Sequence, residues 1–127
     1  MKHIPKINIE IIPHNKQRYN TAGDYFLDNR GIWQFRISEM KNIYYEMFVL
    51  IHELWEWLRV VIVKGIPEPI IAQFDKDHIE HPDPGTLKNA PYHKEHMEST
   101  SIEKFLIKKV KLNWKTYDKS FDKLKYD

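Results

Sequence analysis

The most apolar stretch of the chain contains three side chains that can bind a metal ion or a proton: His52, Glu53 and Glu56. Between residues 41 and 64 the only other formally charged side chains are Glu46 and Arg59. A carboxylate in such surroundings must be paired, protonated or bound to a metal, because burying it bare costs several kcal/mol or more. The sequence therefore indicates a site clearly and a reaction only weakly.

The spacing of these residues suits metal binding on a helix. Residues four apart share a helical face, so His52 and Glu56 project together, about one turn apart. Glu53 is offset by about 100° and can reach a ligand held by the pair. Metalloproteases with an H-E-x-x-H helix use this spacing, with two metal ligands on one face and the intervening Glu as general base. The pattern predicts His52 and Glu56 as ligands and Glu53 as the base.

A structural interpretation of the same residues stays open. In it, Glu56 and Arg59 form an internal ion pair and His52 is a hydrogen-bonded core residue, with no metal involved. Such a cluster would only fix the core of a non-enzymatic binding module.

Two ligands do not hold a metal tightly, so further ones are expected elsewhere in the chain. His96 and Glu103 are seven residues apart, on the apolar side of the helix predicted after Pro91, and should face inward. His96 would complete a three-ligand site with an open position for water. Glu103 is either a further ligand or a carboxylate that orients a histidine. Asp75 directly follows an apolar segment and is another candidate ligand, whereas His3 and His14 are expected at the surface.

The elements that must position these residues predict an α+β fold, with strands first and helices after. Residues 6–12 alternate apolar and polar side chains, which predicts a strand ended by Pro13. Residues 24–28 and 32–37 flank a turn signal and predict a hairpin, and the short N-terminal strands are expected to be antiparallel.

Helices are predicted over the rest of the chain. Ser38 is the expected N-cap of a long helix that ends at Lys64, with Gly65 as its stop signal. A short helix is expected from Pro67 to about Phe74, then a loop over residues 75–90. The last helical segments are expected at residues 91–112 and 114–124.

Composition limits the classes of function. The 127 residues are expected to form a single domain, with a strand-rich part over 1–37 and a helical part over 38–127 that carries the metal site. There is no cysteine, so any divalent metal must use nitrogen and oxygen ligands; zinc is expected first, with manganese or iron as alternatives. The absence of disulfides and of a signal-peptide pattern fits a cytoplasmic protein. Charges interrupt the longest apolar helix, so no membrane span is expected.

Positive charge is concentrated near the C-terminus, although the net charge is only +2. Residues 101–127 hold eight lysines against four acidic residues, interleaved with aromatic side chains such as Trp114 and Tyr117. This pattern is typical of the solvated face of an amphipathic helix, so binding of nucleic acid is not the favoured function.

Two resemblances add to this interpretation. Residues 24–63 and the helix around His96 resemble a minimal zincin metalloprotease, which implies a zinc site and a peptide or protein substrate; zincins have His where this chain has Glu56. Secondly, the combination of residues 52–56 with motifs around Asp75 and His96 resembles a group of small uncharacterised phage and bacterial proteins. That resemblance implies no activity, but it implies that Asp75, His96 and Glu103 belong with the main motif.

The sequence therefore predicts a zincin-like metal-binding protein, with a metal-dependent hydrolase as the favoured activity. The alternative is a phage or bacterial accessory module whose buried cluster is structural. The sequence indicates no oligomeric state.

Overall fold

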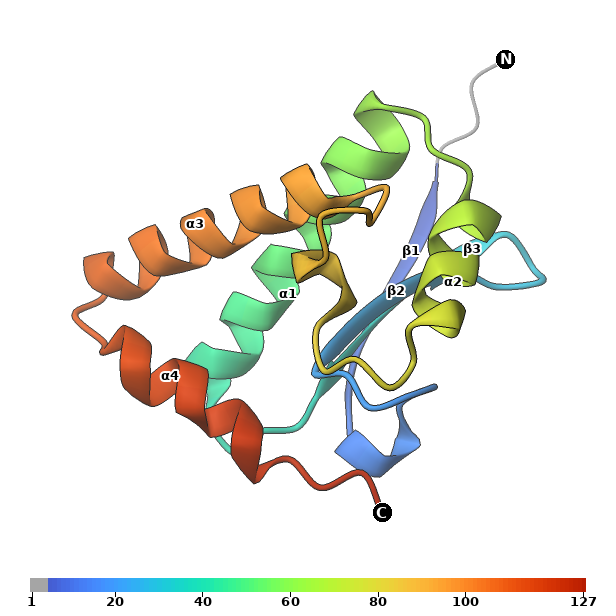
Figure 1. Ribbon diagram of the computed structural model, residues 1–127. Coiled ribbons are helices and arrows are strands. Elements are labelled where there is room, and N and C mark those ends of the chain that lie inside the picture. Colours follow the sequence, from blue (N-terminus) through green and yellow to red (C-terminus); the bar gives the residue numbers. More distant parts are fainter. Residues whose placement is uncertain (1–4) are drawn as a thin grey trace.

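The structure is a computed structural model that describes residues 5–127, and it begins with a mixed three-stranded sheet. The strands β1 (Lys6–Ile12), β2 (Gly23–Leu27) and β3 (Ile32–Ser38) lie in the order β1-β3-β2 (Figure 1). The hairpin of β2 and β3 is antiparallel, as predicted. β1, however, runs parallel to β3, so the prediction of antiparallel strands only was wrong.

The central place of β3 follows from its side chains. Phe35 and Ile37 are fully buried on one face, and Gln34 and Ser38 are buried on the other. A strand that is buried on both faces needs neighbours at both edges, because its backbone groups cannot reach water. The hairpin supplies β2 at one edge of β3, and β1 occupies the other.

A single long helical segment follows the sheet. It consists of α1 (Ile43–Trp57) and a π-helical continuation over Leu58–Val63. Gly65 ends the segment with a positive φ of 69°, as the sequence predicted.

The start of this helix differs from the prediction. Ser38 is the last residue of β3, and its hydroxyl lies 2.7 Å from Nδ1 of His14. The N-cap is Asn42, whose side-chain oxygen accepts hydrogen bonds from the backbone N–H groups of Tyr44 and Tyr45. His14 is therefore buried rather than at the surface, and His3 lies outside the described residues.

Within residues 5–127 three further α-helices follow: α2 (Glu68–Asp77), α3 (His93–Lys109) and α4 (Trp114–Ser120). Because α2 extends to Asp77, Asp75 lies in its last turn and not in the predicted loop. No helix within residues 5–127 is long and apolar enough to cross a membrane.

The helices α1 and α3 lie side by side. Polar contacts between them set which turn of α3 lies opposite which turn of α1. Glu98 on α3 accepts hydrogen bonds from Trp55 Nε1 at 2.6 Å and from Arg59 Nε at 3.0 Å. Ser99 is fully buried and donates to the backbone oxygen of His52 at 3.0 Å. These contacts bring the inward face of α3 opposite the His52 turn of α1.

Candidate metal centre

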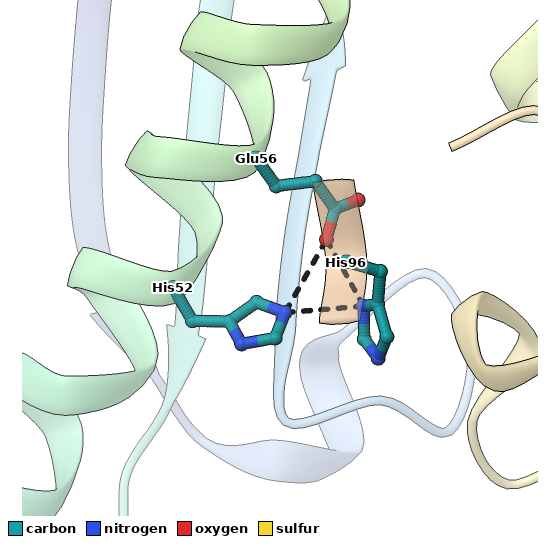
Figure 2. Close-up of side chains that lie close together, drawn as sticks. All are labelled: His52, Glu56 and His96. Atoms are coloured by element: carbon teal, nitrogen blue, oxygen red, sulfur yellow. Dashed lines mark hydrogen bonds and ion pairs between the residues drawn. The ribbon is translucent and has the colours of Figure 1, made fainter. Parts of the chain in front are cut away.

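Three side chains from α1 and α3 meet at one point in the interior (Figure 2). Nε2 of His52 lies 3.3 Å from Oε2 of Glu56 and 3.1 Å from Nδ1 of His96. The third edge of this triangle, from His96 Nδ1 to Glu56 Oε2, measures 3.0 Å. All three residues are buried, with exposed fractions of 8%, 4% and 8%. Residues 5–127 contain no other such group of potential metal ligands.

The partners of the outer ring nitrogens define the protonation of the two histidines. Nδ1 of His52 contacts Oε1 of Glu103, and Nε2 of His96 lies 3.1 Å from Oδ1 of Asp83. A carboxylate accepts hydrogen bonds, so each outer nitrogen carries a proton. In a neutral ring the inner nitrogen then presents a lone pair, because a neutral imidazole has only one N–H.

Two imidazole lone pairs and a carboxylate oxygen thus converge on one point. Without a cation between them, these three acceptors repel one another at about 3 Å. A tetrahedral ion with ligand distances of about 2.0–2.1 Å would hold its ligand atoms about 3.3 Å apart. The triangle has edges of 3.0–3.3 Å, so a small relaxation fits a divalent ion with two nitrogens and one oxygen as ligands. This group could therefore hold a metal.

In the absence of a metal, protons supply the positive charge. Burial alone would lower the pKa of His96, but hydrogen bonds to Asp83 and Glu56 outweigh it and raise the pKa to about 10. Burial likewise opposes protonation of His52, yet Glu103 and Glu56 raise its pKa well above the usual range. Burial would raise the pKa of Glu56, whereas hydrogen bonds from both histidines lower it to about 2. The site is therefore built to attract cations.

A second layer of residues orients the three that form the triangle. Tyr25 donates to Oε1 of Glu56 at 3.0 Å, and Tyr117 donates to the Glu103 carboxylate behind His52. Asp83 supports His96, although its side chain is half exposed. Such outer partners fix the orientation and basicity of metal-binding side chains. Glu103 therefore lies where it orients His52, and it is not one of the three residues that meet.

Sequence reasoning missed Tyr25, Asp83 and Tyr117. Tyr25 carried one usable signal, because strand alternation places it on the same face as Leu27. Tyr117 was grouped with the aromatic residues of the basic C-terminal region, but it is fully buried. Asp83 lies in a loop, for which spacing predicts no partner.

Gly85 makes the support of His96 unusually close. A Cβ at this position would lie 2.4 Å from Cγ and 2.5 Å from Nδ1 of the His96 ring, so no side chain fits there. We expect Gly85→Ala to displace the ring and to weaken zinc binding by about 10- to 100-fold. Isothermal titration with zinc measures this change.

The matched control is Gly31→Ala in the β2–β3 turn. Gly31 has a positive φ of 79° and no neighbours within 4 Å of the added Cβ, so the substitution strains the backbone away from the site. It should lower the melting temperature and leave zinc affinity unchanged. Equal zinc affinities for the Gly85→Ala and wild-type proteins would contradict the contact between Gly85 and His96.

Glu53, the predicted base, lies beside the triangle in a cavity of about 50 Å³. Burial, and then the nearby charge of Glu56, raise the pKa of Glu53 well above the usual range. Gly23 on β2 allows this placement, because a Cβ there would lie 2.6 Å from Oε1 of Glu53. Glu56 and His96 line the same cavity, so Glu53 shares an open space with two of the three residues of the triangle.

Asp75 lies in the wall of this cavity and is not part of the triangle. Its carboxylate contacts the hydroxyl of Tyr92 and lies 3.4 Å from the hydroxyl of Tyr19. Burial raises the pKa of Asp75 to about 6. Asp75 therefore faces the site across the cavity, and its role as a metal ligand stays a prediction.

The alternative interpretation, in which the buried cluster is purely structural, predicted an ion pair between Glu56 and Arg59. Arg59 instead contacts Glu98, and the partners of Glu56 are His52, His96 and Tyr25. The positive charges beside Glu56 are thus protons on histidine rings, which a metal ion can displace. They do not come from a permanently charged guanidinium.

No protein family, curated protein or solved structure matches this chain. Its function must therefore be inferred from its own residues.

Proposed function

We propose that this protein binds a zinc ion, or alternatively manganese or iron, between His52, Glu56 and His96, and that it is a metal-dependent hydrolase. The observation that carries the proposal is the convergence of three potential ligand atoms on one buried point beside a cavity. Two nitrogens and one oxygen suit these metals, and a carboxylate ligand also adds negative charge to the site.

Each residue of the site has a distinct role in this proposal. A bound ion would supply Lewis acidity toward the substrate carbonyl. Glu53 would take a proton from the attacking water, because its carboxylate lines the same cavity as Glu56 and His96. Glu103 and Asp83 would hold His52 and His96 in the tautomers that metal binding requires.

The proposed substrate is a peptide or a protein. The helix that carries His52 and Glu56 contacts β2, a strand at the edge of the sheet, and such an edge strand is what a zincin-like enzyme would use to align its substrate. Gly23 and Tyr25 of β2 line the cavity, so an extended substrate along this strand would reach Glu53. This zincin-like arrangement would use Glu56 where zincins use a histidine.

Glu53→Gln tests the catalytic part of the proposal. The zinc-loaded variant should keep its zinc and lose about 100-fold or more of its turnover, because a positioned general base contributes roughly that much. Hydrolysis is measured with a fluorogenic peptide library, and bound zinc is measured by plasma mass spectrometry on the same samples.

Glu80→Gln is the control, since Glu80 is an exposed acid in the loop after α2. It should behave like the wild-type protein in both measurements. If the zinc-loaded protein cleaves no peptide in the library, or if Glu53→Gln cleaves as fast as wild type, the hydrolase proposal fails. The protein would then be a metal-binding module without this activity.

A further inference from the structure

The edge strand β1 carries apolar side chains that remain half exposed on the core face of the sheet. β1 lies at the edge of the sheet, and α1 packs on β3 and β2. Ile7, Ile9 and Ile11 pair in register with Trp33, Phe35 and Ile37, so they lie on the core face of the sheet. They are nevertheless 42%, 45% and 40% exposed. A row of half-exposed isoleucines on an edge strand invites pairing with another strand.

The backbone of the same three residues faces the free edge. The carbonyl oxygen of Ile12 accepts a hydrogen bond from the N–H of Glu39, which immediately follows β3. Successive residues of a strand direct their backbone groups to opposite sides, so the even-numbered residues of β1 face β3. Ile7, Ile9 and Ile11 therefore direct their N–H and C=O groups outward.

We propose that a second copy of this chain pairs with this edge, β1 against β1, antiparallel about a two-fold axis at Ile9. In this register Ile9 lies opposite Ile9, and Ile7 lies opposite Ile11 of the other copy. All three outward-facing residues then form hydrogen-bonded pairs, which gives about six backbone hydrogen bonds. The two sheets join into one of six strands.

The prolines at the ends of β1 select this register. Pro5 and Pro13 lie four residues on either side of Ile9, so the strand is symmetric about that residue. A shift by two residues would bring a proline, which has no N–H, opposite an isoleucine. A shift by one residue would place isoleucines opposite polar side chains.

The polar face of β1 is also complementary to itself. A two-fold axis at Ile9 would place Asn8 opposite Glu10 of the other copy and Lys6 diagonal to the same Glu10. No like charges lie directly opposite one another. The chain thus supplies the matching side chains, hydrogen bonds and charges, which favours a second copy over an unrelated peptide. The cavity of the metal site lies at β2, the opposite edge, and stays open in the dimer.

The mass of the protein in solution tests the proposal. The wild-type protein should sediment as a dimer at about 100 µM, and Ile9→Lys should sediment as a monomer, because a charge in the apolar row blocks edge pairing. The control is Leu27→Lys, on the core face of the other edge strand and 40% exposed, which should stay dimeric. A monomeric wild-type protein, or a dimeric Ile9→Lys protein with wild-type affinity, would overturn the proposal.

Cysteine cross-linking tests the register without relying on a charged substitution, because the chain has no cysteine of its own. Hydrogen-bonded residues in an antiparallel pair have Cα atoms about 5.5 Å apart, within the reach of a disulfide. Ile9→Cys should therefore form a covalent dimer on mild oxidation. Ile7→Cys should cross-link with Ile11→Cys in a mixture, and much more slowly with itself. Failure of Ile9→Cys to cross-link would contradict the register. So would cross-linking of Ile7→Cys with itself at the same rate as with Ile11→Cys.

Zinc binding distinguishes this proposal from the proposed function. The Ile9→Lys monomer should bind zinc with wild-type affinity, because β1 contributes no residue to the metal site. The dimer proposal can thus be contradicted while zinc binding is confirmed, and zinc binding can be contradicted while the dimer is confirmed.

Discussion

Zinc affinity is expected to fall by about a thousand-fold when His96 is replaced by alanine. The substitution removes one of three ligands, and its cost must exceed the 10- to 100-fold that changes behind a ligand produce. A competition titration against a chromophoric chelator measures both dissociation constants. His78→Ala is the control, because His78 stacks on Phe74 and is not one of the three residues that meet. Equal affinities of His96→Ala and wild-type protein would show that zinc binds elsewhere.

The second large effect is the dependence of zinc binding on pH. The pKa of His96 is raised to about 10 and that of His52 lies well above 6.5, so both rings are protonated in the metal-free protein at neutral pH. Zinc must displace both inner protons, because it takes the lone pairs that they occupy. The association constant should therefore rise with pH, by up to about 100-fold per pH unit while both rings remain protonated.

Calorimetric titration at several pH values, in buffers of different ionisation enthalpy, measures both the slope and the protons released. About two protons should appear for each zinc bound. Release of fewer than about one proton, with an affinity that is independent of pH, would contradict the protonated triangle.

The metal-free protein should show the opposite trend in stability. Burial opposes protonation of His96, but its carboxylate partners raise its folded pKa to about 10, above the unfolded value of about 6.5. The contribution of His96 to the free energy of unfolding is then fully present below about pH 6.5 and is lost as the pH rises through about 10. Raising the pH thus weakens the metal-free site while it strengthens zinc binding.

The sequence was most informative where a single helix sets the geometry. His52 and Glu56 share a face because they are four residues apart, and His96 and Glu103 share a face because they are seven apart. Helical periodicity fixes such relations locally, without knowledge of the tertiary fold. Both helices bring these faces together, as His52 contacts both His96 and Glu103.

Relations between distant segments were not readable in the same way. Asp83 and Gly85 support His96 from a loop, where no periodicity indicates a direction. Tyr25 reaches Glu56 across 31 positions, and this contact exists only once α1 has packed on the sheet. The prediction of an ion pair between Arg59 and Glu56 was wrong for the same reason. Arg59 is near Glu56 along one helix, but its partner Glu98 lies on α3.

Local signals also competed with one another at element boundaries. Ser38 and Asn42 both belong to residue types that cap helices, and only Ser38 was predicted as the N-cap. The hydroxyl of Ser38 is already engaged by His14, so the helix begins at the second. Likewise, the pairing of β1 with β3 depends on the free edge of β3, which strand patterns do not specify.

The most direct test is a crystal structure of the zinc-loaded protein with anomalous data at the zinc edge. We expect one anomalous peak between α1 and α3, at about 2.0–2.1 Å from His52 Nε2, His96 Nδ1 and a Glu56 oxygen. A peak elsewhere, or no peak between these three side chains at saturating zinc, would contradict the metal centre.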